Sequence, residues 1–330
     1  MKRLAWVVTY VLVFAVSFAA GALVPPLLSG QSGPFRPVAW DDSVGSVETD
    51  LTYGDGPRNR YDLYLPSDRE RGTKMVVYLH AGGFTSGDKS DDEDIAKYFT
   101  SLGYVTATIN YPLSSDENPV SVVDMSQAIA EGVTAAVSSA QSRGYDVDGL
   151  AMGGGSAGGA LAMIYAYRDA HQAPVPVEAV IQMVGPASFD PAAWFGLTDG
   201  YSSDESAASG AEFVSVISGA PVTPQMMRSG AYRDALAPVS AIDLVTEQAP
   251  PTLAAYGALD KVAPYAASAE LAPALAAHGV PHDVLVFPNS GHGLNRDSDM
   301  SDKLHGLIEE YLTRYVPLGD VSASRVANTS

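Results

Sequence analysis

Short apolar runs alternate with amphipathic segments along most of this chain. Residues 75–79, 105–109 and 177–184 are mainly apolar, which is typical of strands covered on both faces. The spacing of apolar positions predicts helices at residues 91–101 and 122–142. Strands that alternate with helices form a mostly parallel sheet flanked by helices, so the predicted fold class is α/β.

Two earlier segments alternate apolar with polar residues instead. Residues 47–53 and 60–65 have the period of two that half-exposed strands show, and the turn between them is Gly54-Asp55-Gly56-Pro57. We therefore expect an antiparallel hairpin at one edge of the sheet.

The alternation stops over residues 185–236, which are rich in Pro, Gly, Ser and aromatic residues. We expect short helical pieces at best in this segment. The pattern resumes with a strand at 252–256, a helix at 263–278, a strand at 283–287 and a final helix at about 299–315. Residues 185–236 are therefore predicted to be a lid or cap insertion after the sixth strand, which shapes the pocket.

A glycine-rich turn separates the apolar run that ends at Met152 from the apolar residues 161–167. It contains Gly154-x-Ser156-x-Gly158, the nucleophile-elbow pattern, in which a tight strand-to-helix turn exposes a strained serine. The two glycines remove β-carbons that would collide across such a turn. The same residues could merely connect a strand to a helix, so partners elsewhere in the chain must distinguish the two interpretations.

Two such partners follow later predicted strands. Asp260 comes after the strand at 252–256, and His292 comes after the strand at 283–287. The chain order serine, acid, histidine is the order of α/β-hydrolases. Imidazole has a suitable pKa to activate a serine hydroxyl, and a carboxylate on its far nitrogen fixes the tautomer. Ser156, His292 and Asp260 are therefore the predicted catalytic triad.

Donors for an oxyanion hole are expected at two places. Gly82 and Gly83 follow the strand at 75–79 and could present bare N–H groups beside that of Ala157, the first residue after the serine. The helix that starts after Ser156 adds the positive end of its dipole.

Together, these motifs resemble those of a known family. It is similar to α/β-hydrolase esterases of the hormone-sensitive-lipase-like group and to the small carboxylesterases, over roughly residues 45–316. Besides the elbow, the matching pieces are Tyr61-Asp62-Leu63-Tyr64-Leu65-Pro66, the loop His80 to Phe84 with Gly87-Asp88-Lys89, Asn110-Tyr111-Pro112-Leu113-Ser114, and Gly291-His292. The resemblance implies an α/β-hydrolase fold and gives His80 a structural place in its loop.

Two departures from the family pattern matter. The family loop usually reads His-Gly-Gly-Gly, and Ala81 replaces its first glycine here. Pro112 stands where the family usually has arginine, which puts the contacts of that arginine in doubt.

The N-terminus carries a separate signal. Lys2 and Arg3 precede an apolar stretch at residues 4–24, and Ala20-Gly21-Ala22 fits a secretory cleavage pattern. The stretch is also long enough to span a bilayer. The stretch therefore has two interpretations, a cleaved signal peptide or an uncleaved membrane anchor. Both place the rest of the protein outside the cytoplasm.

These features divide the chain into four parts. Residues 1–24 are a signal peptide or anchor, and the Pro-, Gly- and Ser-rich residues 25–45 are a linker. Residues 46–316 form the α/β-hydrolase catalytic domain, and residues 317–330 are predicted to be a flexible tail.

Composition excludes several function classes. The formal charge is −19, without clustered cations, so nucleic acid is not an expected partner. The chain has no cysteine, which excludes a thiol nucleophile and disulfides. No group of side chains has metal-ligand spacing, so we expect neither a metal nor a cofactor.

Other candidate residues have simpler explanations. Asp243 lies within the irregular insertion and not after a strand, which makes it a weaker candidate than Asp260 for the triad acid. The four acids at 91–94 could suggest a cation site, but acids that open a helix are more simply explained as solvated side chains that complement its dipole. Surface or packing roles are expected for the remaining histidines, which are His171, His278, His282 and His305.

The sequence thus predicts a serine hydrolase that cleaves a small-molecule carboxylic ester through an acyl-enzyme, secreted or membrane-associated through residues 4–24. The nearest alternative is amide, formamide or peptide hydrolysis, or acyl transfer, on the same triad. A non-catalytic binding module on a hydrolase fold is the alternative from another class.

Overall fold

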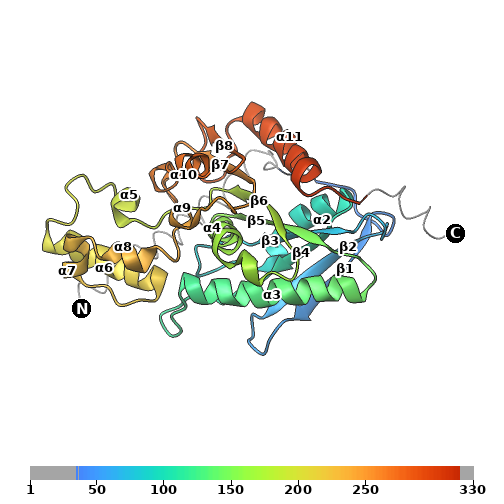
Figure 1. Cartoon of the computed structure of the whole chain (residues 1–330), viewed down its shortest axis with the longest axis horizontal. Helices are drawn as coiled ribbons and strands as arrows, with labels where there is room; N and C mark the ends of the chain where they lie inside the picture. Colours follow the sequence, from blue (N-terminus) through green and yellow to red (C-terminus); the bar gives the residue numbers. More distant parts are fainter. Residues whose placement is uncertain (1–34, 36, 320–330) are drawn as a thin grey trace.

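The computed structural model describes residue 35 and residues 37–319 (Figure 1). The predicted signal peptide or anchor at residues 1–24 and the tail beyond residue 319 lie outside these described residues, as does most of the predicted linker. Within the described part of the chain, no helix combines the length and the apolar character that crossing a bilayer requires.

The described strands form one sheet in the spatial order β1-β2-β4-β3-β5-β6-β7-β8. β1 pairs antiparallel with β2, and β2 pairs antiparallel with β4, whereas all other neighbours are parallel. The strands are β1 (Gly45–Thr52), β2 (Arg60–Pro66), β3 (Lys74–Leu79), β4 (Val105–Ile109), β5 (Gly149–Gly155), β6 (Val177–Met183), β7 (Thr252–Gly257) and β8 (His282–Phe287). This arrangement confirms the predicted fold class and the edge hairpin.

Helices cover both faces of the sheet (Figure 1). α2 (Glu93–Ser101) and α11 (Ser298–Tyr315) pack on one face, and α3 (Val122–Ser142) and α4 (Ala157–Ile164) pack on the other. The short helical segments outside the insertion are η1 (Lys89–Asp92), η2 (Tyr165–Asp169), η3 (Ala170–Gln172), η4 (Tyr265–Ala267) and α10 (Leu271–Ala277).

β3 shows why the strands are apolar on both sides. Met75, Val77 and Leu79 join the core beneath α3 and α4, whereas Val76 and Tyr78 join the core beneath α2 and α11. Because successive side chains of a strand point to opposite faces, a strand between two helical layers buries every position. Each fully buried large side chain contributes about 1.5–3 kcal/mol.

The segment between β6 and β7 is more helical than the sequence predicts. It contains α5 (Pro191–Phe195), α6 (Asp204–Ser218), α7 (Pro224–Ser229), α8 (Tyr232–Leu236) and α9 (Ala241–Leu244). The helices α5 to α8 form a lobe at the left of Figure 1, whereas α9 lies beside α4 and α10. The expectation of short helical pieces is wrong for α6, which has 15 residues. Ser203 caps its first turn through Ser206 N–H, and Gly219 ends it in the left-handed region. Its buried face is made mainly of small residues, which weakens the apolar period.

The predicted helix at residues 263–278 is also wrong in its bounds. The structure has the single turn η4 and then α10, which starts only at Leu271. Pro273 explains the late start, because a proline lacks the N–H that a helix interior needs and its ring clashes with the carbonyl four residues earlier. Within α10 it falls in the first turn, where no N–H is required.

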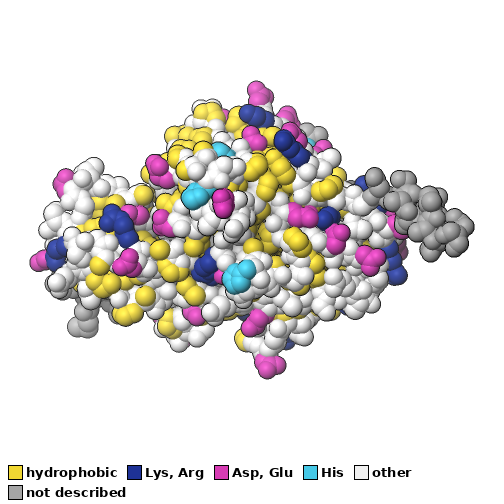
Figure 2. All heavy atoms as spheres, in the orientation of Figure 1, with side chains coloured by type: hydrophobic (Ala, Val, Ile, Leu, Met, Phe, Trp, Pro, Cys, Tyr) yellow, Lys and Arg dark blue, Asp and Glu magenta, His cyan; other side chains and the backbone are white. Residues whose placement is uncertain are grey.

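Charged side chains are dispersed over the surface, with Lys and Arg interspersed among Asp and Glu on the face in Figure 2. Some of these charges join distant elements. Lys74 Nζ lies 3.0 Å from Asp148 and 2.7 Å from Glu178, and Arg143 pairs with Glu48 across α3 and β1. Lys74 thus joins the start of β3 to the starts of β5 and β6 in the centre of the sheet, and Arg143 joins the end of α3 to the edge strand β1.

Candidate active site

Ser156 occupies a strained turn between β5 and α4. Its φ of 52° and ψ of −120° lie in a region that costs a non-glycine residue about 1–3 kcal/mol. The two glycines of the motif allow this turn. A β-carbon at Gly154 would lie 2.4 Å from the carbonyl carbon of Gly158, and one at Gly158 would lie 1.9 Å from the carbonyl oxygen of Leu79. The elbow therefore packs directly against the end of β3.

The structure brings the three predicted triad residues together. His292 Nε2 lies 2.9 Å from Ser156 Oγ, and His292 Nδ1 lies 2.7 Å from Asp260 Oδ2. With Nδ1–H donating to the carboxylate, Nε2 is the acceptor that faces the serine hydroxyl. All three side chains are largely buried, with Ser156 only 4% exposed.

Asp260 is held by its own loop as well as by His292. Its Oδ1 accepts hydrogen bonds from the N–H groups of Val262 (2.8 Å) and Ala263 (3.0 Å), which leaves Oδ2 for the imidazole. The loops after β7 and β8 also contact each other, since Leu259 N–H donates to Ser290 O at 3.0 Å. This backbone contact places Asp260 beside His292, although 32 residues separate them.

The loop after β3 has the conformation that only glycine adopts easily. Gly82, Gly83 and Phe84 have φ values of 130°, 60° and 67° in succession. A β-carbon at Gly82 would lie 1.9 Å from Ser86 O. Ala81 is not among the residues with positive φ, so the methyl group that replaces the family's first glycine is tolerated there.

The three predicted oxyanion donors have unused N–H groups. Among the described residues, the N–H groups of Gly82, Gly83 and Ala157 donate to no acceptor, although Gly82 O accepts hydrogen bonds from Thr85 and Ser86. Bare N–H groups on a glycine loop and at the first turn of α4 are the kind of donors that stabilise an oxyanion.

His80 is not part of the triad and lies in the loop that carries Gly82 and Gly83. Its side chain is fully buried and stacks on Tyr111, with ring centroids 4.2 Å apart. Burial lowers the pKa of His80 to about 4, so the ring is neutral near pH 7. Arg58, which sequence reasoning missed, contacts this ring from the β1–β2 turn. An isolated arginine in a turn carries no sequence signal for such a contact.

Asp243 lies on α9, and the imidazole nitrogen that it would need to orient is bonded to Asp260 instead. The other histidines lie on the outer elements. His171 Nδ1 bonds to Arg168 O, His282 Nδ1 bonds to Val280 O, His278 ends α10, and His305 pairs with Glu309 on α11. Within the described residues, no cluster of three His, Asp or Glu side chains could hold a metal ion.

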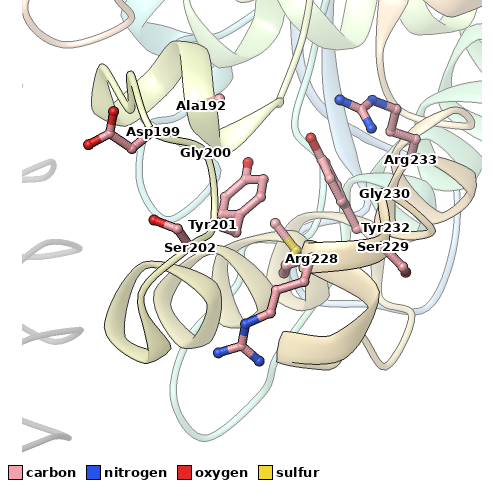
Figure 3. Close-up of a pocket in the computed structure, with 11 residues that line it drawn as sticks. Ala192, Asp199, Gly200, Tyr201, Ser202, Arg228, Ser229, Gly230, Tyr232 and Arg233 are labelled. Carbon is pink, nitrogen blue, oxygen red and sulfur yellow. The ribbon is translucent and has the colours of Figure 1, made fainter.

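A cavity of about 560 Å³ lies within the helical insertion and is separate from the triad (Figure 3). Figure 3 shows Tyr201 and Tyr232 side by side with their hydroxyl groups pointing in the same direction. Both hydroxyls donate to the carboxylate of Asp190, at 3.1 Å from Tyr201 and 3.1 Å from Tyr232. Asp190 also caps α5 through Ala192 N–H, so one carboxylate ties three parts of the insertion together.

Residues 61–275 match the sequence profile of the BD-FAE family, a stretch that runs from β2 to α10. The chain belongs to the BD-FAE family. This confirms the resemblance to α/β-hydrolase esterases that the motifs indicate. The BD-FAE match includes Ser156 and Asp260, and His292 lies beyond its end.

Solved structures share the BD-FAE chain's fold at low identity. An inhibited esterase B from Lactobacillus rhamnosis has a TM-score of 0.64 and 18% identity, over 90% of this chain and 94% of that one. A truncated carbohydrate esterase from gut microbiota has a TM-score of 0.64 and 17% identity, over 84% of this chain and all of that one. The thermophilic esterase of Thermogutta terrifontis has a TM-score of 0.63 and 20% identity, over 84% and 96%.

Curated relatives match a smaller part of the BD-FAE chain. A probable isoprenylcysteine alpha-carbonyl methylesterase of Oryza sativa is 26% identical over 151 residues, and its counterpart in Arabidopsis thaliana is 26% identical over 155 residues. These matches cover 46% and 47% of this chain. The chain spans about a third of the length of each of these relatives, at 34%.

Proposed function

We propose that this protein is a serine hydrolase that cleaves small carboxylic esters. The observation that carries the proposal is the bridge from Ser156 Oγ through His292 to Asp260, at 2.9 and 2.7 Å, on a strained elbow. Membership of an esterase family and the names of the methylesterase relatives support an ester as the substrate.

In the proposed mechanism His292 Nε2 takes the proton of Ser156 as Oγ attacks the ester carbonyl carbon. The negative charge that develops on the carbonyl oxygen is stabilised by the N–H groups of Gly82, Gly83 and Ala157. His292 then donates its proton to the leaving alcohol, and the Ser156 acyl-enzyme forms. Asp260 stabilises the imidazolium in both steps, and water releases the acid by the same sequence.

The helical insertion, residues 185–236, is proposed to cover the active site around Ser156. Its first residues support this assignment, because Phe189 packs against Phe84 of the loop after β3, with ring centroids 5.8 Å apart. A substrate bound at Ser156 would therefore lie close to the insertion.

The test is incubation of the full chain with a fluorophosphonate probe, followed by peptide mass spectrometry, with turnover of p-nitrophenyl acetate measured in parallel. We expect label on Ser156 and turnover, both abolished in Ser156→Ala at an unchanged melting temperature. Turnover retained by Ser156→Ala would overturn the proposal. Label on Ser156 combined with faster cleavage of a p-nitroanilide than of the ester would identify an amide hydrolase instead.

A further inference from the structure

Arg58 lies in the turn between β1 and β2, and its guanidinium reaches the loop that carries two predicted oxyanion donors. We propose that Arg58 is a positioning residue for catalysis, which sets the direction of the Gly82 N–H through His80. This inference rests on the proposed function of the same site. It assigns a role to a residue outside the triad and the oxyanion hole.

The guanidinium joins both ends of the oxyanion loop, residues 80–87. Arg58 Nη2 lies 3.2 Å from His80 Nε2 at the start of the loop, and the same nitrogen donates to Gly87 O at 2.8 Å at its end. Both Gly82 and Gly83 lie between these two contacts. A single side chain therefore fixes the separation of the two ends.

Further hydrogen bonds fix the guanidinium itself. Arg58 Nε donates to Tyr111 O at 2.9 Å, and Asn110 Oδ1 lies 3.0 Å from Nη2. The two N–H groups of Nη2 are therefore shared among Gly87 O, Asn110 Oδ1 and His80 Nε2. Tyr111 and Asn110 directly follow β4, so Arg58 also ties the β1–β2 turn to the end of that strand.

The hydrogen-bond pattern determines which nitrogen of His80 carries the proton. Nδ1 lies 2.6 Å from Ala81 O, which can only accept, so Nδ1–H donates to it. Nε2 is then the acceptor that faces the Arg58 N–H. Burial keeps the ring neutral, and the positive charge of Arg58 favours the same state, because a protonated ring would present a second donor to the guanidinium.

The link to catalysis runs through one peptide plane. The carbonyl of Ala81 and the N–H of Gly82 belong to the same peptide unit, which is planar. The His80 ring holds the Ala81 oxygen, so it also fixes the direction of the Gly82 N–H. Tyr111 prevents the ring from turning, since it stacks on it and its hydroxyl donates to His80 O at 2.8 Å.

The test compares Arg58→Ala and Arg58→Lys with Arg60→Ala in the full chain. Arg60 is a matched control, because it lies on the same hairpin and donates to its neighbour Asn59 O. Active sites are counted by fluorophosphonate labelling, so that kcat refers to folded enzyme. We expect kcat for p-nitrophenyl acetate to fall about 10- to 100-fold in Arg58→Ala. A misdirected N–H no longer stabilises the oxyanion, and this stabilisation acts mainly in the transition state. KM should change by less than about threefold.

Two further readouts separate positioning from a merely structural role. Added guanidinium ion should restore part of kcat in Arg58→Ala and leave Arg60→Ala unchanged. The charges that face His80 are Arg58, Asp88 and Asp91, so removal of Arg58 leaves only acids beside it. The pKa of His80, followed by NMR, should rise in Arg58→Ala and stay unchanged in Arg60→Ala.

The proposal is overturned if Arg58→Ala keeps the wild-type kcat per active site, or if Arg58→Lys loses activity only through a smaller labelled fraction. Failure of the proposed function looks different, because the wild type would then show neither label nor turnover. In that case the amide NMR shifts of Gly82 and Gly83 still decide the positioning role. They should change in Arg58→Ala and not in Arg60→Ala, and equal shifts in the two variants would refute it.

Discussion

The rings of Phe84 and Phe189 meet edge to face, with centroids 5.8 Å apart and an angle of 62° between their planes. Phe84 belongs to the oxyanion loop, and Phe189 opens the helical insertion. Phe189 continues the contact outward, since it stacks on Trp194 of α5. Changes within the insertion are therefore expected to affect the oxyanion loop.

Asp190, the residue after Phe189, offers a direct test of this coupling. Asp190→Asn replaces a charged acceptor of the Tyr201 and Tyr232 hydroxyls with a neutral one, and hydrogen bonds to charged groups contribute about 1.5–3 kcal/mol. We expect a melting temperature several degrees lower and a higher KM for p-nitrophenyl butyrate, at a similar kcat. Asp199→Asn, an exposed change in the same lobe, is the control and should alter neither quantity. Unchanged KM in Asp190→Asn would show that the insertion and the site are not coupled.

The identity of the triad acid is tested by a pair of variants. Asp260→Asn should lower kcat by about four orders of magnitude, because the amide favours the wrong tautomer of His292. Asp243→Asn should leave kcat near the wild-type value, since its carboxyl lies on α9 and His292 Nδ1 is bonded to Asp260. Steady-state kinetics on p-nitrophenyl acetate distinguishes them. A larger loss in Asp243→Asn than in Asp260→Asn would mean that the acid is misassigned.

Asp92 should make stability depend on pH. Its side chain is buried, Oδ2 has no hydrogen-bond partner among the described residues, and burial followed by the charge of Asp91 raises its pKa from 3.8 to about 8. Because the folded chain holds the proton of Asp92 more tightly than the unfolded chain does, the stabilisation is complete below the ordinary pKa of 3.8. It is lost progressively as pH rises towards 8. The free energy of unfolding should therefore fall between pH 6.5 and 8.

Asp92→Asn should flatten that slope in urea unfolding, and Asp94→Asn, at an exposed position, should keep it. His80 acts in the opposite direction near pH 6.5, because its pKa of about 4 in the folded chain lies below the ordinary value of about 6.5 in the unfolded chain, and all three proteins share this contribution. The same slope in Asp92→Asn as in the wild type would exclude Asp92 as its source.

Gly158→Ala should damage the elbow more than any other methyl group added in α4. The new β-carbon would lie 1.9 Å from Leu79 O, so β3 or the elbow must move. We expect little folded protein, and the fraction that folds should have no activity. Gly306→Ala in α11 is the matched change, because nothing lies within 4 Å of its new methyl group, and it should stabilise the chain by about 0.5–1 kcal/mol. Thermal melting and fluorophosphonate labelling measure both effects.

Local patterns in the sequence were enough for the sheet and the order of the site residues. Strands such as β3 bury both faces, so their composition alone identifies them. Gly154-x-Ser156-x-Gly158 is equally recognisable as a local motif. A β-carbon at Gly154 would collide within the turn, whereas one at Gly158 would collide with Leu79 O of β3. Asp260 and His292 were predicted since each follows a strand, and parallel strands bring their carboxyl ends to one edge of the sheet.

Two helices show where local pattern was insufficient. α6 buries a face built mainly of small residues such as Ala207, Gly210 and Ala211, which bury little apolar surface each and give a weak period. α10 was predicted too long, because its apolar spacing extends back past Pro273, whose ring prevents an earlier start.

Only the tertiary structure decided the supports of the site. Arg58 meets His80 across 22 residues and Tyr111 across 53, and these contacts exist because β2 lies beside β4 and β4 lies beside β3. Asp190 meets Tyr232 across 42 residues, because the helices of the insertion pack together. A hydrogen bond between distant segments leaves no periodic pattern in either segment, so the sequence does not reveal such a contact. The sequence determined the reacting groups, whereas the packing of strands and loops determined which side chains hold them.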